Sequence, residues 1–112
     1  GLTVLGGEPF EPKNQRELLP LLREIREKYP YKTIWCFTGF RLEDELLQDG
    51  SYPRCEVTDD LLHCIDILVD GRFLREEKDI SLQFRGSRNQ RIIDLPRTLS
   101  SDRIVLWDQL RR

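Results

Sequence analysis

The sequence predicts an α/β fold in which buried parallel strands alternate with helices. Three short apolar runs, at 1–5, 33–37 and 65–69, are typical of strands that are covered on both faces. The order strand–helix–strand–helix–strand is the pattern of right-handed βαβ units. The chain has 112 residues, the size of one domain, and no linker-like stretch divides it. We therefore expect a single domain over 1–112.

The first helix is predicted to follow a turn that is rich in glycine and proline. Asn14 is expected to cap it, and apolar residues at helical spacing extend it to about Lys28 (Leu18, Leu19, Leu22 and Ile25). A proline within the run 29–31 ends it, because the residue before proline disfavours the helical conformation. A short helix is expected over 42–47, and a short helix or loop over 59–64.

The C-terminal third of the chain predicts a different arrangement. Apolar segments at 82–84 and 91–95 flank the polar run Arg-Gly-Ser-Arg-Asn-Gln at 85–90, which predicts a hairpin or a pair of extended segments. The segment 104–107 predicts a last short strand. The βα units should thus be followed by a hairpin and one further strand.

Composition argues against several classes of protein. Lysine and arginine (18) nearly balance aspartate and glutamate (20), whereas domains that bind nucleic acid are usually strongly basic. No apolar run approaches the ~18 residues of a membrane span. Cys36, Cys55 and Cys64 are an odd number at irregular spacing, which predicts a reduced, cytoplasmic protein without a disulfide framework. Cys36 is expected to be a buried hydrophobe, and Cys55, His63 and Cys64 lack standard zinc spacing.

The first candidate site is the turn Gly6-Gly7-Glu8-Pro9. It lies just past the carboxyl end of the first predicted strand, where open α/β sheets and barrels bind ligands. Its glycines let a ligand approach the backbone, whose carbonyl and N–H groups can hold the amino and carboxylate groups of an amino acid. Glu8 adds an acceptor for an ammonium group. The tetrapeptide alone is equally compatible with an ordinary βα turn.

Two further groups of polar residues have two interpretations each. Asp70 and Arg72 follow the third predicted strand and suit a zwitterionic or ribose-bearing ligand, although spacing alone favours their pairing at the surface. Arg85, Arg88 and Arg91 form a local basic patch that suits phosphates or an acidic partner. Such a charge run in a loop is more often simply solvated.

Two stretches of the chain carry a resemblance to a known family. The run GLTVLGGEPF at 1–10 resembles the second strand and GGEP motif of radical S-adenosylmethionine enzymes. The stretch FRGSRNQRIID at 84–94, with DILVDG at 66–71 and IVLW at 104–107, resembles more specifically the activating proteins of anaerobic ribonucleoside-triphosphate reductase. The resemblance runs in order along essentially the whole chain.

This resemblance implies a partial (β/α) barrel and a radical mechanism. Members of the family hold a [4Fe-4S] cluster through Cys-x3-Cys-x2-Cys, and S-adenosylmethionine chelates its fourth iron. An electron from a donor such as a flavodoxin cleaves S-adenosylmethionine, and the 5′-deoxyadenosyl radical takes a hydrogen from a glycine of the reductase. The resemblance implies that Gly6, Gly7 and Glu8 hold the methionine amino group. The other cofactor-binding candidates are Thr38, Asp70 and Arg72.

The chain departs from the family pattern in one large respect, because it contains no Cys-x3-Cys-x2-Cys. A strand that begins at residue 1 leads us to expect a missing N-terminal part with the first βα unit and the cluster loop. Such a chain would be inactive alone and prone to self-association through an unpaired strand edge. Two other functions stay open: an activator of another glycyl-radical enzyme, and a non-catalytic module that docks on a reductase through 85–94.

Arg85, Arg88 and Asn89 are polar, clustered and outside the predicted βα core, so we predict that they face the reductase. Arg88→Glu should slow activation of the reductase, and more so at low salt, where charges are weakly screened. Cleavage of S-adenosylmethionine without the reductase should survive. Assays of both activities at two ionic strengths check this, and an equal loss of both would assign the segment to the cofactor site or the fold.

Overall fold

The computed structural model describes most of the chain, namely residues 2–4, 7–71, 90–101 and 103–107. Several sequence predictions lie outside these residues. They are the extended segment 82–84 and the site candidates Gly6, Arg72, Arg85, Arg88 and Asn89.

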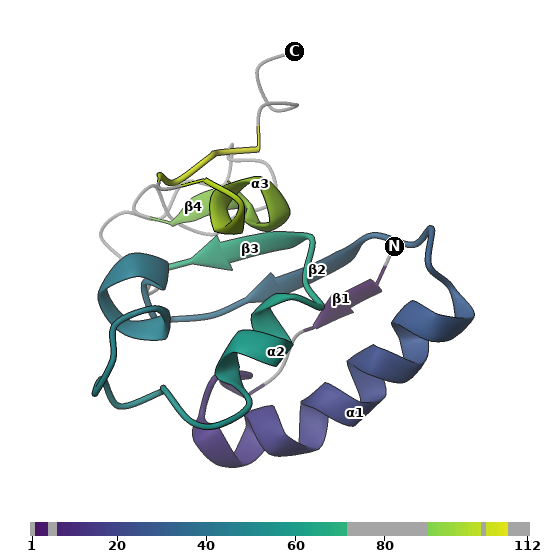
Figure 1. Cartoon of the computed structure of the whole chain (residues 1–112), viewed down its shortest axis with the longest axis horizontal. Helices are drawn as coiled ribbons and strands as arrows, with labels where there is room; N and C mark the ends of the chain where they lie inside the picture. The colour runs from purple at the N-terminus through teal and green to yellow at the C-terminus, as the bar shows by residue number, and fades with distance from the viewer. Residues whose placement is uncertain (1, 5–6, 72–89, 102, 108–112) are drawn as a thin grey trace.

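A four-stranded mixed sheet forms the centre of the fold (Figure 1). The strands β1 (Leu2–Val4), β2 (Ile34–Phe37) and β3 (Ile67–Asp70) are parallel and neighbour one another in chain order. The fourth strand, β4 (Arg91–Asp94), pairs antiparallel with β3. The predicted α/β class is confirmed, and the closure of such a sheet into a partial barrel stays a prediction.

Helices connect the strands and pack on the sheet. α1 (Pro12–Lys28) and α2 (Thr58–Leu62) contact each other and lie on the same side of the sheet in Figure 1. After β2 comes η1 (Leu42–Leu46), a π-helical segment, and α3 (Leu95–Leu99) follows β4 directly. None of the described helices is long and apolar enough to cross a membrane.

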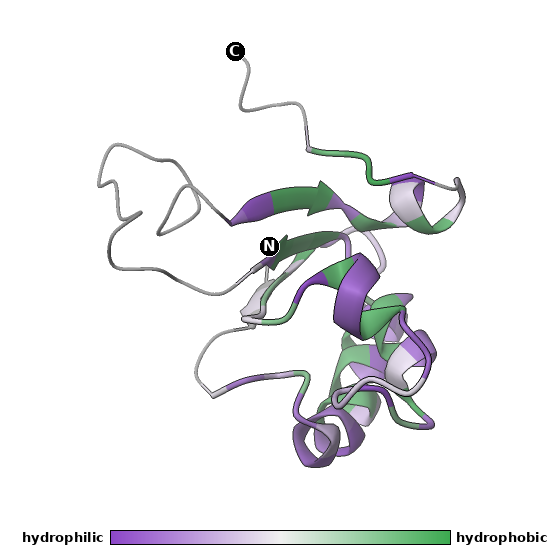
Figure 2. Cartoon of the chain, turned by 90° about the vertical axis from the view of Figure 1, so that its left-hand side faces the viewer, coloured by the Kyte–Doolittle hydropathy of each residue, from purple (hydrophilic) through white to green (hydrophobic). Residues whose placement is uncertain are grey.

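The main hydrophobic core lies between the sheet and these helices. Alternate residues of β2, Ile34 and Cys36, are buried in it, together with Leu68 of β3 and Ile93 of β4. The helices contribute a second set of buried side chains, which are Leu19, Leu22, Leu42, Leu46, Leu61 and Leu62. Figure 2 shows the same division, with hydrophobic strands at the centre and helices that are partly hydrophilic. The expectation that Cys36 is a small buried hydrophobe is confirmed.

The opposite face of the sheet carries a smaller apolar cluster. Ile67, Val69 and Ile92 are buried there, and the partly buried Trp35, Phe37 and Trp107 pack against them. The rings of Trp35 and Trp107 meet edge to face, with centroids 4.9 Å apart, which is a favoured geometry for aromatic pairs. β3 is therefore buried on both faces, as expected of a strand with neighbours on both sides.

The N-terminal boundary of the first helix differs from its prediction. Glu11 occupies the N-cap position and Pro12 opens the helix, so Asn14 is not the cap. The Asn14 amide instead donates to the Glu8 carbonyl oxygen at 2.8 Å. Proline at the first helical position needs no hydrogen-bond partner for its nitrogen, which favours this earlier start.

The later elements also differ in their bounds. β3 begins at Ile67 rather than at residue 65, because Ile65 is held in a turn by its N–H bond to the Leu62 carbonyl. Asp94 ends β4 and caps α3 by accepting from the Arg97 N–H at 3.2 Å. The predicted last strand at 104–107 is reduced to one bridge, Ile93 with Leu106, and β4 takes β3 as its strand partner.

Gln15 is a buried polar side chain that the sequence did not predict. Its amide nitrogen donates to the carbonyl oxygens of Phe10 (2.7 Å) and Pro53 (2.6 Å). Its amide oxygen accepts from the Thr58 hydroxyl at 2.6 Å. One side chain thereby joins the start of α1 to the segment that leads into α2.

Replacing Gln15 should destabilise the fold markedly. Gln15→Leu keeps the approximate volume but leaves two carbonyl oxygens and a hydroxyl without this buried partner, so we expect a loss of about 2–4 kcal/mol in the free energy of unfolding. The matched control is Gln48→Leu at an exposed position, where a change within about 0.5 kcal/mol is expected. Denaturant titrations compare the two, and equal effects would contradict this role of Gln15.

Candidate functional site

A pocket of about 260 Å³ lies where the turns after the three parallel strands meet. Its lining comes from four segments and consists of Gly7, Glu8, Pro9, Phe37, Thr38, Gly39, Gly71 and Gln90. The carboxyl ends of parallel strands are the usual place for ligands in α/β sheets. The structure therefore brings together Gly7, Glu8 and Thr38, three of the predicted site residues.

The Glu8 carboxylate ties the turn after β1 to the turn after β2. One oxygen, Oε2, accepts from the Phe10 N–H at 2.9 Å and from the Thr38 hydroxyl at 2.6 Å. The other, Oε1, accepts from the Gly39 N–H at 2.7 Å. All three donors belong to the protein itself, so this side chain is held in place without any ligand.

The hydrogen bonds continue from Thr38 to the turn after β3. The Thr38 hydroxyl accepts from the Phe40 N–H at 3.2 Å, and the Phe40 carbonyl accepts from the Gly71 N–H at 3.0 Å. The Gly71 carbonyl then accepts from the Gln90 side-chain amide at 3.1 Å. Gly71 has a φ of 99°, a left-handed conformation that favours glycine. A connected set of hydrogen bonds thus borders the pocket from Glu8 to Gln90.

Gly7 leaves its part of the pocket open. A Cβ atom built on Gly7 would have no atom within 4 Å, and the residue is exposed. Its φ lies outside the left-handed region, so backbone strain does not demand a glycine here. The sequence predicted that a ligand could approach the backbone closely at Gly7, and this open space agrees with that prediction.

Asp70 lies next to the pocket but is fully buried and engaged elsewhere. Its carboxylate accepts from the Leu42 N–H at 2.8 Å and pairs with the Arg91 guanidinium, which also forms two hydrogen bonds to Glu43. The antiparallel register of β3 and β4 sets Asp70 opposite Arg91. The interpretation of Arg91 as part of a solvated basic patch is therefore wrong, since it occupies a partly buried ion-pair network.

This network changes the acidity of its members. The hydrogen bonds from Arg91 lower the pKa of Glu43 from 4.5 to about 2, although partial burial acts in the opposite direction. The same bonds to Glu43 and Asp70 raise the pKa of Arg91. Glu43 is thus ionised at every pH at which the protein is expected to work.

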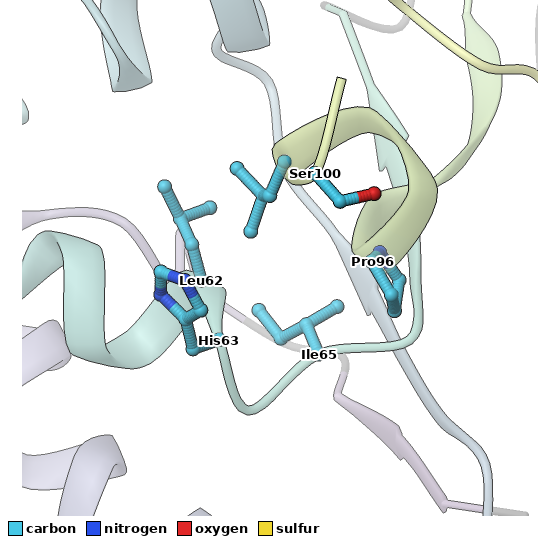
Figure 3. Close-up of a pocket in the computed structure, with 6 residues that line it drawn as sticks. Leu62, His63, Ile65, Pro96 and Ser100 are labelled. Atoms are coloured by element: carbon cyan, nitrogen blue, oxygen red, sulfur yellow. The ribbon is translucent and has the colours of Figure 1, made fainter.

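Two other hollows are less suited to a polar ligand. A pocket of about 230 Å³ lies between α2 and α3, at the amino end of β3, and Figure 3 shows Leu62, Ile65 and Pro96 around it. It is also lined by His63, whose Nδ1 lies 2.7 Å from the backbone carbonyl oxygen of Asp59. A wider trough of about 450 Å³ between η1 and α3 contains none of the predicted site residues.

Comparison with known proteins places the chain in a family. The profile of the 4Fe-4S single cluster domain matches residues 1–93. The chain belongs to this family. Among curated proteins, it is 39% identical over 90 residues to the anaerobic ribonucleoside-triphosphate reductase-activating protein of Haemophilus influenzae, covering 80% of the chain and 52% of that protein. No solved structure matches the chain.

Two further relatives carry the same name. The Escherichia coli K12 protein is 41% identical over 90 residues, covering 80% of the chain and 53% of that protein. The protein of Enterobacteria phage T4 is 33% identical over 94 residues, covering 82% of the chain and 51% of that protein. The chain thus spans about half the length of the curated relatives that it matches.

The cysteines of this 4Fe-4S family member do not fit a cluster. Such clusters need several thiolates gathered at one point. Cys36 is buried in the core, where burial and the nearby Glu8 carboxylate raise the pKa of its thiol, and burial also raises the pKa of Cys64. Cys55 contacts Gln15 instead. In the described part of the chain, no group of three histidine, cysteine or acidic side chains could hold a metal ion.

The sequence analysis missed some of the residues that build the pocket. Gly39 lies in the turn after β2, two residues past the end of the strand, as Gly7 lies in the turn after β1, so the same rule about strand ends would have found it. Gln90 had no comparable signal, because it reaches Gly71 across 19 residues of sequence. Arg91 was noted for its charge, but only the β3–β4 pairing shows its partners.

The Glu43–Arg91 pair predicts a dependence of stability on pH. Because the folded pKa of Glu43 lies below its ordinary 4.5, the pair stabilises the fold above that pH and loses this contribution as the pH falls toward 2. Glu43→Gln should therefore be less stable than the unaltered protein at pH 7, and the difference should shrink between pH 4.5 and 2. Denaturant titrations across this range measure it, with the exposed Asp44→Asn as control. A difference that does not change with pH would contradict the assignment.

Proposed function

We propose that this chain forms part of an activating protein for anaerobic ribonucleoside-triphosphate reductase and binds the methionine end of S-adenosylmethionine. The observation that carries the proposal is the pocket that joins the open backbone of Gly7 with Glu8 and Thr38 at the carboxyl ends of parallel strands. The names of the relatives supply the reductase as partner. The chain spans about half the length of those relatives.

The chemistry of the pocket supports an amino-acid ligand. Backbone carbonyls of the lining, beside the negative charge of the Glu8 carboxylate, favour an ammonium group. Its volume of about 260 Å³ suits one end of a ligand, while the rest extends past the open side at Gly7. S-adenosylmethionine supplies the hydrogen-abstracting radical in glycyl-radical activases. The described residues would bind and orient it.

The proposal assigns the cluster ligands to residues outside this chain, since its own cysteines are spread through the fold. Asp70 and Arg72 remain less favoured cofactor contacts, because the Asp70 carboxylate is used by Arg91. Arg85, Arg88 and Asn89 remain the proposed contacts with the reductase, and a flavodoxin remains the proposed electron donor. We further propose a cytoplasmic location.

The cysteines also favour a second candidate, a non-catalytic module that docks on a reductase, because such a module needs no cluster. An activator of another glycyl-radical enzyme would keep the cluster but change the partner. The residues encoded upstream of Gly1 separate these functions. A Cys-x3-Cys-x2-Cys motif there supports the activase, and its absence supports the docking module.

A side chain at Gly7 should block the ligand without harming the fold. A Cβ atom here meets no protein atom within 4 Å, so Gly7→Val should leave the thermal midpoint nearly unchanged. The added methyl groups would occupy the space of the methionine end, and we expect an affinity for S-adenosylmethionine at least about tenfold weaker, or ~1.4 kcal/mol. Gly7→Ala should have a smaller effect in the same direction.

Calorimetric titration of the full-length protein with S-adenosylmethionine measures both variants. Unchanged affinity in Gly7→Val would remove the pocket from consideration as the ligand site. A large loss of thermal stability would instead show that the glycine has a structural role.

A further inference from the structure

We propose that Glu8 is a positioning residue: its carboxylate holds the turn 38–40 in the shape that forms the pocket. This inference deepens the proposed function, on which its ligand rests. The Gly7 backbone then makes the principal contact with the ammonium group. The sequence alone had suggested Glu8 itself as the acceptor for that group.

The first argument is the number of donors that the carboxylate already serves. An ionised carboxylate has about four acceptor positions, and three of those of Glu8 are filled by Phe10 N–H, Thr38 Oγ1 and Gly39 N–H. Hydrogen bonds to a charged acceptor are among the stronger ones in proteins. Glu8 is therefore fixed before a ligand arrives, and little of its capacity is left.

The second argument is that a buried donor, the Thr38 hydroxyl, would lose its acceptor without Glu8. Thr38 is buried, and within the described residues its hydroxyl has one acceptor, Glu8 Oε2. A buried hydroxyl without an acceptor is costly, so the contact favours one arrangement of the two turns. The sequence separation of 30 residues means that no local turn chemistry could supply it.

The third argument is that Glu8 controls more than its direct contacts. Thr38 also accepts from Phe40 N–H, and the Phe40 carbonyl accepts from Gly71 N–H. Loss of the carboxylate would release Thr38 and Gly39 from Glu8 and let the turn after β2 move away from the turn after β1. The pocket between them would lose its shape even though the Gly7 backbone is unaltered.

The test uses four single variants of the full-length protein and one double variant. Glu8→Gln keeps the size of the side chain but replaces one acceptor oxygen with a donor. Thr38→Val removes only the hydroxyl, and Thr38→Ser keeps it. Glu11→Gln is the matched control, because the Glu11 carboxylate accepts from the Tyr52 hydroxyl and does not line the pocket.

Two measurements are made on each variant. Hydrogen exchange of the Gly39 and Phe10 amides, without any ligand, reports how firmly the turns are held. Calorimetric titration with S-adenosylmethionine then reports the affinity, and the double variant Glu8→Gln/Thr38→Val gives the coupling between the two side chains.

A positioning role predicts the following pattern. Glu8→Gln and Thr38→Val both speed exchange of the Gly39 amide about tenfold or more and both weaken the affinity. The double variant has the same Gly39 exchange rate and affinity as the more severe single variant, because both changes break the same hydrogen bond between Glu8 and Thr38. Thr38→Ser and Glu11→Gln resemble the unaltered protein.

Two outcomes would overturn the proposal. One is Gly39 exchange that Glu8→Gln leaves unchanged. The other is an affinity that Glu8→Gln weakens but Thr38→Val does not, which would make Glu8 a direct ligand of the ammonium group. Failure of the unaltered protein to bind S-adenosylmethionine would overturn the proposed function instead, and the exchange measurements would still decide whether Glu8 holds the turn.

Discussion

The buried pair of Asp70 and Arg91 is the interaction on which the carboxyl-end edge of the sheet depends. Asp70 is fully inaccessible to solvent, and a buried carboxylate is tolerated only when it is paired and hydrogen-bonded. Arg91 supplies the pairing from β4 and reaches on to Glu43 in η1. One charged group in β3 therefore fixes both the antiparallel strand and the π-helical segment.

The same pair acts on the pocket through its neighbours in sequence. Gly71 follows Asp70, and Gln90 precedes Arg91, so the two pocket residues that contact each other are held by the ion pair beside them. On the other side, Leu42 N–H is bound by Asp70, which limits where the chain from Thr38 can run. The pocket thus lies between two anchors, the Asp70–Arg91 pair and the Glu8 carboxylate.

Most of the fold could be predicted from the sequence because its strands and first helix have strong local patterns. The β2 sequence alternates buried and partly exposed residues, and α1 carries its leucines at helical spacing. The strand pattern also predicted the position of the candidate site, because the carboxyl ends of parallel strands lie at the same edge of the sheet. What could not be predicted depends on pairs distant in sequence. Gln15 contacts Thr58 across 43 residues, and Arg91 contacts Glu43 across 48.

Charge alone was a poor guide to the role of a residue in this chain. The sequence grouped Arg91 by charge with Arg85 and Arg88, but the register of β3 and β4 sets it opposite a buried carboxylate. Glu8 was predicted as a ligand group from its charge, and its carboxylate already accepts from three protein donors. In both cases the side chain satisfies the backbone and side-chain groups of other segments. Before a polar residue beside a glycine-rich turn is assigned to a ligand, its hydrogen bonds to neighbouring turns have to be examined. Such turns leave backbone N–H groups that need an acceptor.

In the proposed function, a pocket built in this way would recognise its ligand mainly through backbone groups. Its lining includes Gly7, Gly39 and Gly71, and its polar side chains hold the turns that present those glycines. Backbone groups have fixed geometry once the turns are fixed, so selectivity for an amino-acid end would come from the spacing of the turns and from few side-chain charges. The hydrogen bonds that shape the pocket join residues of the described part of this chain, in which no group of three histidine, cysteine or acidic side chains could hold a metal ion.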